Sequence, residues 1–200
     1  MSLLHQLHER RIHSRRVRSL LRHLVPLLPS DGEILDIGCG DGLLSYLIQQ
    51  ELPNATLTGI DTLVRPDTAI SVTEFDGDTI PMDDNSVDAA LLVDVLHHTD
   101  DAAVLLREAR RVARRWVVVK DHTRDGFLAG PTLRFMDYIG NAHHGVSLPY
   151  NYLSTIQWQD LLQELQIHIE TWNARPTMYG VPGDWLFGRR LHVVMRLEKE

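Results

Sequence analysis

The chain has 200 residues, 44% hydrophobic and 24% charged, proportions that are typical of a globular protein and exclude a disordered one. Its formal net charge of -7 disfavours a general affinity for polyanions, and no apolar run reaches the roughly 18 residues that a membrane-spanning helix needs. The only cysteine is Cys39, which excludes an intrachain disulfide, and the N-terminus is charged where a signal peptide is apolar. We expect a cytoplasmic protein.

The first thirty residues predict an amphipathic helix over 3–28, because leucines recur at three- and four-residue spacings and Pro26 and Pro29 mark its end. We expect a helical extension over 1–30 and one domain over 31–200. A second face of this helix is basic. It is either a solvated face or a docking surface for RNA, an anionic membrane or an acidic carrier protein. Its arginines are Arg11, Arg15, Arg18 and Arg22.

From residue 33 onward, strand-like and helix-like segments alternate. Strands are predicted at 33–38, 55–60, 71–75, 87–96 and 116–122, and helices at 42–52 and 101–114. This alternation predicts βαβ units and a parallel sheet with helices on both faces. Further helices are predicted at 131–141 and 155–166. Two strands near the C-terminus, at 167–172 and 191–199, have no helix between them and predict an antiparallel pair at a sheet edge. The expected fold is an α/β, Rossmann-like, doubly wound, mostly parallel sheet.

A glycine-rich loop follows the first strand, where a doubly wound sheet binds its ligands. The dinucleotide fingerprint Gly-x-Gly-x-x-Gly requires glycine at 43, but Leu43 stands there. Asp36 precedes the first glycine by two positions, where a carboxylate repels a pyrophosphate but suits an ammonium group. Asp61 ends the second strand 19 residues after Gly42, which suits an acceptor for ribose hydroxyls.

The stretch from about Glu33 to His122 resembles the class I S-adenosylmethionine-dependent methyltransferases, on the segments ILDIGCGDG, TLTGID and FDGDTIPMDDNSVDAALLVDVLHHTDD. More narrowly, it is similar to the small-molecule branch that includes the ubiquinone and menaquinone biosynthesis methyltransferases. The resemblance covers about half the chain and is specific for cofactor and fold rather than for substrate. It implies S-adenosylmethionine as cofactor and S-adenosylhomocysteine as product.

The resemblance also implies a set of cofactor-binding residues. The loop after the first strand lies at the methionine end of the cofactor, Asp61 and Thr62 lie at the ribose and adenine, and Asp94 and Val95 line the methionine portion. Asp76, with Asp78 as a competitor, accepts from the adenine amino group. The loop residues are Asp36, Gly38, Cys39, Gly40 and Gly42, and the Gly77 backbone lies against the adenine. The chain departs from the family before its fifth strand, where Ala113–Trp116 replaces a Pro-Gly-Gly turn.

Candidates for the acceptor end come from the strand ends and from the segment 123–166, which we expect to cover the substrate. Asp121 and His122 end the fifth strand and are candidates for substrate contact. Histidine is the natural base near neutral pH, so His97 and His98 are either a base or a structural pair. The segment 140–152 combines paired histidines with tyrosines between glycines, a composition that favours substrate binding over a plain connecting loop. Its leading residues are His143, His144 and Tyr150.

We therefore expect a methyltransferase that acts on a small, hydrophobic or carrier-bound metabolite. Methylation of RNA or protein is an alternative, supported by the basic helix and opposed by the net charge and by Asp94-Val95-Leu96-His97 in place of an Asn-Pro-Pro-Tyr motif. A non-catalytic cofactor-binding protein and a nicotinamide oxidoreductase are further alternatives. Despite eleven histidines, we expect no metal site, because the chain has one cysteine and no His-x-x-x-His on a convincing helix face.

Overall fold

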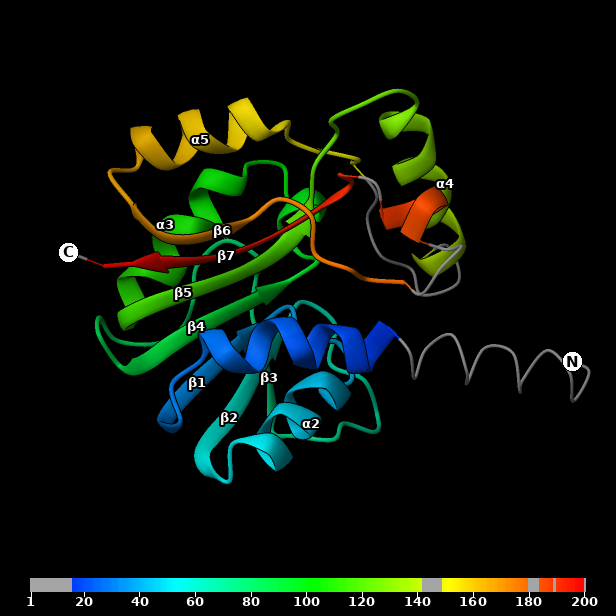
Figure 1. Cartoon of the computed structure of the whole chain (residues 1–200). Helices are drawn as coiled ribbons and strands as arrows, with labels where there is room; N and C mark the ends of the chain where they lie inside the picture. Colours follow the sequence, from blue (N-terminus) through cyan, green and yellow to red (C-terminus); the bar gives the residue numbers. More distant parts are fainter. Residues whose placement is uncertain (1–15, 142–148, 180–183, 189, 200) are drawn as a thin grey trace, which may run out of the picture.

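A computed structural model describes residues 16–141, 149–179, 184–188 and 190–199. A seven-stranded sheet in the order β3-β2-β1-β4-β5-β7-β6 forms its centre. The five strands from β3 to β5 run parallel, whereas β7 is antiparallel to both β5 and β6. The predicted Rossmann-like sheet with an antiparallel C-terminal pair is confirmed (Figure 1).

The elements follow one another in the predicted alternation. The strands are β1 (Asp31–Ile37), β2 (Asn54–Asp61), β3 (Val72–Glu74), β4 (Val87–Val93), β5 (Ala113–His122), β6 (His168–Asn173) and β7 (His192–Glu198). The α-helices are α2 (Leu43–Glu51), α3 (Ala102–Val112), α4 (Ala129–Asn141) and α5 (Thr155–Glu164), and the shorter helices are η1 (Val25–Leu27), η2 (Leu96–His98) and η3 (Asp184–Gly188). Residues 16–24 form a further helix.

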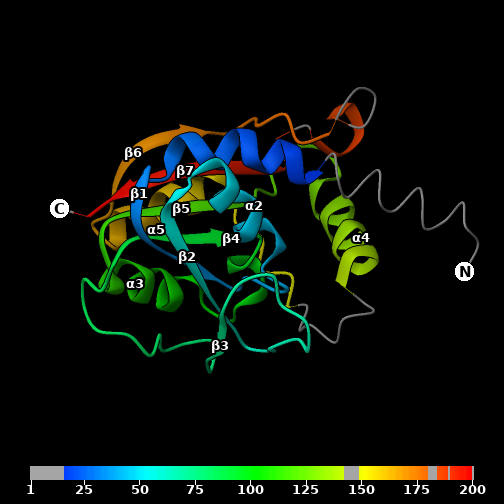
Figure 2. The ribbon, with the colours of Figure 1, turned by 90° about the horizontal axis from the view of Figure 1, so that it is seen from below.

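Both faces of the sheet are buried, because successive strand side chains point to opposite sides and both sides are apolar. Ile34 and Leu35 of β1, for example, lie in two different cores. The first core packs the sheet against α3 and α5, and the second packs it against α2 and the helix at 16–24 (Figures 1 and 2). Because β1 and β4 are neighbours, the strand order reverses between them, and the chain ends its parallel strands at one common edge.

The helix at 16–24 is packed into the second core. Leu20 and Leu24 are buried beside strand residues, and Ser19 Oγ donates to the Thr177 carbonyl at 2.5 Å. His23 Nε2 lies 3.2 Å from the same carbonyl oxygen. These contacts place Arg16 at the carboxyl edge of the sheet, where the glycine loop also lies. The first half of the predicted 3–28 helix lies outside the described residues.

The junction between α3 and β5 differs from the predicted boundaries. The third predicted helix ends at Val112 rather than 114, and β5 begins directly at Ala113. The chain therefore turns from helix to strand without a loop, because Val112 and Ala113 are both fully buried and hold the junction in the core. Among the described residues, we find no helix of the length and apolarity that a membrane span requires.

Candidate functional site

The loop after β1 has a shape that only glycines adopt easily. Gly38, Gly40 and Gly42 all have positive φ angles, of 72°, 62° and 71°. A Cβ on Gly38 would stand 2.6 Å from Val95 Cγ2, and one on Gly42 would stand 2.5 Å from Ile70 Cγ1. Gly40 differs, because the nearest atom to its added Cβ is a side-chain nitrogen 3.7 Å away. The loop is thus tightly packed at its two ends and open at its centre.

Asp36 is a buried carboxylate at the end of β1. It is 3% exposed, and Ser45 Oγ donates to its Oδ2 at 2.5 Å. Burial raises the pKa of Asp36 to about 7, an effect that the Ser45 hydrogen bond opposes and the nearby Asp61 reinforces. A cation at this point would relieve the burial cost. Cys39, in the same loop, turns its Sγ toward Gly59, and burial raises its thiol pKa to about 12.

Asp61 ends β2 opposite the glycine loop. Its Oδ2 accepts from the Gly40 amide at 2.7 Å and its Oδ1 accepts from the Leu63 amide at 3.0 Å. Each carboxylate oxygen has a further lone pair, so both remain able to accept from ligand hydroxyls. The two backbone bonds fix the carboxylate at the rim between β1 and β2.

The loop after β3 adds a second acidic group to this rim. Asp76 Oδ1 accepts from the amides of Asp78 and Thr79 at 2.9 and 2.7 Å, which lowers the pKa of Asp76. Gly77 has φ of 95°, and an added Cβ would lie 3.2 Å from Thr62 Cγ2. The ends of β2 and β3 are therefore in contact at the predicted adenine position, with Asp76 exposed to solvent.

A different kind of chemistry lies beyond β4 and β5. Asp94, at φ 58°, has a carboxylate that pairs with the Lys120 ammonium on Oδ1 and with Arg16 Nη2 on Oδ2, the latter at 2.6 Å. His122 Nε2 is 3.4 Å from the same Oδ1. Burial alone would raise the pKa of Asp94, but the charges of Lys120 and Arg16 outweigh it and hold that pKa well below its ordinary value. Asp94 is thus an anion between cations.

His97 is the centre of a second buried group. Its Nδ1 donates to Asp121 Oδ1 at 2.6 Å, and its Nε2 lies 3.5 Å from Asp137 Oδ2. Asp121 also accepts from the amides of Leu96 and His122, at 2.9 and 2.6 Å. Burial lowers the pKa of His97, but Asp121 and then Asp137 outweigh it and raise that pKa to about 10. His97 is accordingly a buried imidazolium between two carboxylates.

The other histidines of this region are held neutral. Burial, with His97 nearby, lowers the pKa of His98, whose ring centroid is 4.0 Å from that of His97. Burial and the Lys120 charge hold the pKa of His122 well below its ordinary value, and its Nδ1 donates to the Leu191 carbonyl at 3.1 Å. A neutral imidazole is able to accept a proton, and an imidazolium is not.

Helix α4 and the segment 149–152 cover this histidine group. Asp137 of α4 accepts from the Tyr152 hydroxyl, and the Tyr152 ring stacks on His97 with centroids 5.4 Å apart. Asn151 fixes the segment, since its backbone N–H donates to the His97 carbonyl at 3.2 Å. Tyr150, at φ 59°, is partly exposed under the Arg134 guanidinium. The predicted residues His143 and His144 lie outside the described residues.

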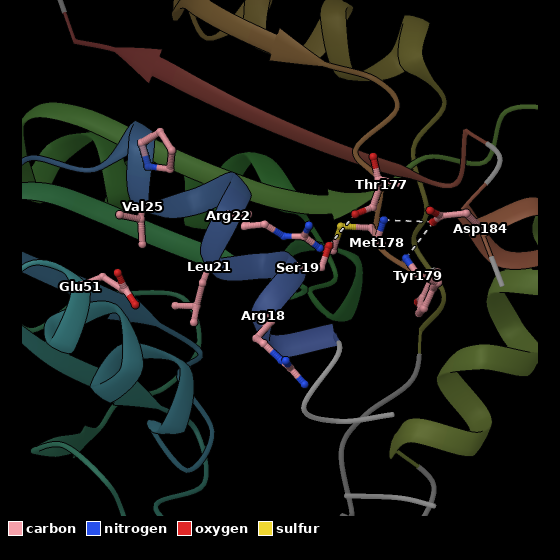
Figure 3. A pocket seen from close by; sticks show the side chains of 11 residues that line it. Arg18, Ser19, Leu21, Arg22, Val25, Glu51, Thr177, Met178, Tyr179 and Asp184 are labelled. Carbon is pink, nitrogen blue, oxygen red and sulfur yellow. Dashed lines mark hydrogen bonds between the residues drawn. The ribbon is translucent and has the colours of Figure 1, made fainter. Parts of the chain in front are cut away.

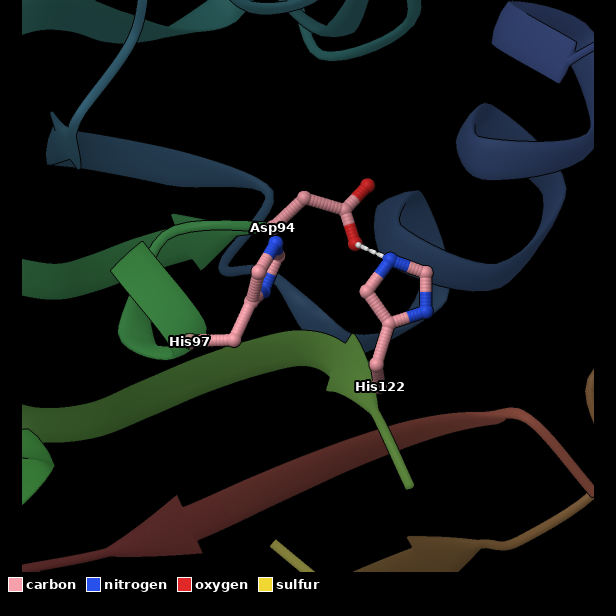
Figure 4. A group of neighbouring side chains, drawn as sticks. All are labelled: Asp94, His97 and His122. Carbon is pink, nitrogen blue, oxygen red and sulfur yellow. Dashed lines mark ion pairs between the residues drawn. The ribbon is translucent and has the colours of Figure 1, made fainter. Parts of the chain in front are cut away.

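Among the described residues, two groups of side chains bring possible metal ligands within 4.8 Å of one another: Asp94 with His97 and His122, and His97 with His98 and Asp137. Figure 4 shows the first group, with the Asp94 carboxylate directed at His122. In that group, Lys120 and Arg16 already contact the two carboxylate oxygens, and their charges oppose a further cation. The expected absence of a metal stays a prediction.

A groove of about 1260 Å³ lies elsewhere, between the helix at 16–24, the end of α2, residues 177–179 and Asp184 (Figure 3). Arg18, Arg22 and Thr177 contribute to its lining, and Asp184 Oδ1 accepts from the Met178 and Tyr179 amides at 3.1 and 2.7 Å. None of the glycine-loop residues lines it. We therefore place the candidate site at the strand ends, where the titratable groups converge, and not in this larger groove.

The structure brings most of the predicted residues together along one edge, with the acidic rim residues at β1, β2 and β3 and the histidines at β4 and β5. Several residues that join this site have no role predicted from the sequence, although two of them carry a signal. Lys120 is a charge directly after three valines, and Asp137 is an acid on the buried side of a helix. The residues that lacked an assigned role are Arg16, Lys120, Asp137 and Tyr152.

Comparison with known proteins identifies the family of the chain. Residues 6–174 match a family described as a methyltransferase domain. The chain belongs to this family. It has the domain of an S-adenosylmethionine-dependent methyltransferase, and the cofactor of such a domain is S-adenosylmethionine. The branch and the acceptor within the family are a separate question.

Relatives by sequence and by structure are distant. An uncharacterised 37.1 kDa protein in a transposon of Streptomyces fradiae is 38% identical over 91 residues, which is 40% of this chain and 26% of that protein. The chain thus spans about a quarter of that relative's length. By structure, the methyltransferase is similar to an S-adenosylmethionine-dependent methyltransferase of Mesorhizobium loti, with a TM-score of 0.68 and 17% identity over 90% of this chain and 98% of that one.

A second structure, an S-adenosylmethionine-dependent methyltransferase of Methanosarcina mazei, gives a TM-score of 0.62 with 16% identity over 88% of this chain and 96% of that one. A third comes from a Haloferax volcanii complex between the methyltransferase activator Trm112 and its methyltransferase partner. There the TM-score is 0.67, with 14% identity over 94% of this chain and 92% of that one. At these identities, the structural likeness shows the fold.

Proposed function

We propose that this methyltransferase methylates a small-molecule acceptor, held at the ends of β4 and β5 beneath α4, with the cofactor along the ends of β1, β2 and β3. The observation that carries the proposal is the covered group around His97. Its polar side chains, His97, Asp121 and Asp137, are only 2%, 1% and 6% exposed. Only a compact molecule that enters beneath α4 would reach them, which favours a metabolite over a folded RNA or protein surface.

The cofactor end fits the chemistry of S-adenosylmethionine. Asp36 is a buried carboxylate, and burial raises its pKa. An ammonium group beside it would offset the cost of burying the negative charge. Asp61 has acceptor capacity for two ribose hydroxyls, and Asp76 and the Gly77 backbone suit the adenine. The open centre of the loop, at Gly40, leaves room for close approach of a ligand. The remaining cofactor contacts that we propose are Gly38, Cys39, Gly42, Thr62, Asp94 and Val95.

Bound S-adenosylmethionine supplies an activated methyl group, so the protein must mainly align the acceptor, exclude water and remove a proton where the acceptor carries one. His98 is the base that we propose. Its pKa is lowered, so its imidazole is neutral, whereas His97 is held as an imidazolium. Tyr150 stands at the open side of the same group and is proposed to contact the acceptor, as are His143 and His144 from the sequence.

The test measures formation of S-adenosylhomocysteine with S-adenosylmethionine and three sets of acceptors: small phenols, amines and carboxylic acids; total RNA; and basic peptides. We expect turnover with one class of small molecule. Turnover confined to RNA or peptides would contradict the proposal, and so would tight S-adenosylhomocysteine binding without turnover on any set.

A second measurement tests the base. His98→Gln should lower kcat strongly and remove the acidic limb of the pH profile of kcat/KM, a limb that lies below pH ~6.5 in the wild type because the pKa of His98 is lowered. His168→Gln, an exposed histidine on β6, is the matched control and should change neither quantity. An unchanged pH profile in His98→Gln excludes His98 as the base.

A further inference from the structure

Arg16 reaches the proposed cofactor site from the N-terminal helix. Its Nη2 contacts Asp94 Oδ2 at 2.6 Å, and the next residue, Val95, packs against Gly38 of the glycine loop. Asp36 lies two residues before Gly38 on the other side. Asp36 stands two residues after Ile34 on β1, so the two side chains point to the same face of the sheet. That face is the one that α2 and the helix at 16–24 cover, because Ile34 belongs to the second core. Arg16 is therefore linked to Gly38 through Asp94 and Val95, and Asp36 is linked to it along the chain.

The Asp94 carboxylate is shared by two cations that differ in their need for it. Lys120 is fully buried, and loss of its carboxylate partner would leave an unpaired buried charge. The Arg16 side chain is 43% exposed, so water or a ligand is able to accept hydrogen bonds from its guanidinium. A guanidinium has five N–H donors in a planar fork, and the Asp94 contact uses only one. Arg16 is thus the cation that is able to bind a second anion while Lys120 keeps Asp94 neutralised.

The methionine end of the cofactor carries one ammonium and one carboxylate. The ammonium has a partner in Asp36, and the carboxylate needs a cation within a few ångströms of Gly38. A guanidinium matches a carboxylate with two parallel hydrogen bonds, which is the strongest common pairing of this kind. We propose, resting on the proposed placement of the cofactor, that Arg16 binds the cofactor's carboxylate and so makes the N-terminal helix part of the cofactor site.

The proposed contact of Arg16 would also help to hold the helix at 16–24 in place. The helix at 16–24 is anchored at its far end by Leu24 and in its middle by Ser19 and Thr177. Its first described residue carries the guanidinium. Cofactor binding therefore adds to the Arg16–Asp94 ion pair a second contact at the end of the helix that faces the site, and it links residues 16–24 to the glycine loop through the ligand.

The test compares two ligands that differ only at the amino-acid end. Calorimetric titration gives the Kd of S-adenosylhomocysteine, which carries the carboxylate, and of 5′-methylthioadenosine, which lacks it. Arg16→Ala should weaken S-adenosylhomocysteine about tenfold or more, because a charged hydrogen-bonded pair is lost, and leave 5′-methylthioadenosine unchanged. Arg16→Lys should lie between the wild type and Arg16→Ala. Arg22→Ala, an exposed arginine on the same helix, is the control and should change neither Kd.

Each other result has one meaning. Equal weakening of both ligands in Arg16→Ala assigns to Arg16 only a role in holding the helix, and overturns the proposal. No weakening of either ligand also overturns it. Failure of the wild type to bind either ligand contradicts the placement of the cofactor itself. This result is distinguishable from a failure of the Arg16 proposal, in which the wild type binds both ligands.

Discussion

The two halves of the candidate site are built by different means. At the ends of β1, β2 and β3, main-chain groups set the geometry. Three positive-φ glycines shape the loop, and backbone amides donate hydrogen bonds to the Asp61 and Asp76 carboxylates. At the ends of β4 and β5, side chains hold one another. His97 is 2% exposed between Asp121 and Asp137, and fully buried Lys120 pairs with Asp94.

Because of this difference, the two halves should respond differently to substitutions. A rim made of backbone is set by a short local motif and binds a constant ligand. A buried ionic cluster depends on every member, because removal of one partner leaves an uncompensated charge. We therefore expect substitutions in the first half to change ligand affinity, and substitutions in the second half to change the stability of the fold as well as turnover.

Among the substitutions, Asp121→Asn is expected to lower stability most. Asp121 is 1% exposed and accepts three hydrogen bonds, one of them from the His97 imidazolium. Urea denaturation should show a loss of about 3 kcal/mol in the free energy of unfolding. Asp67→Ala, an exposed carboxylate beyond β2, is the control and should stay within about 0.5 kcal/mol. A loss in Asp121→Asn no larger than in the control removes the contrast between the two halves.

The next effect is a dependence of stability on pH. The pKa of His97 is raised to about 10 in the fold, so the folded protein keeps a proton that the unfolded chain loses near pH 6.5. This stabilisation is complete below pH ~6.5 and disappears as the pH rises toward about 10, with a slope approaching ~1.4 kcal/mol per pH unit. Denaturation of His97→Gln across the same range should lack this slope. A slope that is the same in both proteins contradicts a buried imidazolium.

For the rim, Asp61→Ala should weaken binding of S-adenosylhomocysteine by roughly 1–3 kcal/mol, since the carboxylate is proposed to accept from both ribose hydroxyls. Calorimetric titration measures this change directly. Asp67→Ala serves again as the control, because it is exposed and close in sequence. An affinity equal to that of the wild type removes Asp61 from the site.

The smallest effect on stability is expected from Gly40→Ala. The added methyl group meets no atom closer than 3.7 Å, so the cost is that of a positive φ, about 1 kcal/mol. The methyl group nevertheless stands on the open side of the loop, where the cofactor is proposed to approach. Titration should therefore show weaker S-adenosylhomocysteine binding in a protein that remains folded. Unaltered binding would show that the ligand does not approach the loop at Gly40.

The same contrast explains what the sequence was able to predict. The alternation of strands and helices, the glycine loop and Asp61 follow from patterns within about 30 residues, because periodicity and spacing encode local structure. The buried cluster joins Arg16, Asp94, Lys120, Asp137 and Tyr152 across more than a hundred residues of chain. No spacing rule connects such positions. Lys120, directly after the three valines of β5, and Asp137, on the buried side of α4, were the local signs that a buried charge needed a partner.

The most direct test of the account is a crystal structure with S-adenosylhomocysteine bound. We predict its ribose hydroxyls on Asp61, its amino-acid end over Gly38 between Asp36 and Arg16, and its sulfur directed toward the histidines beyond β4. Density for the ligand in the groove lined by Arg18, Arg22 and Thr177, with the glycine loop free, would contradict the account.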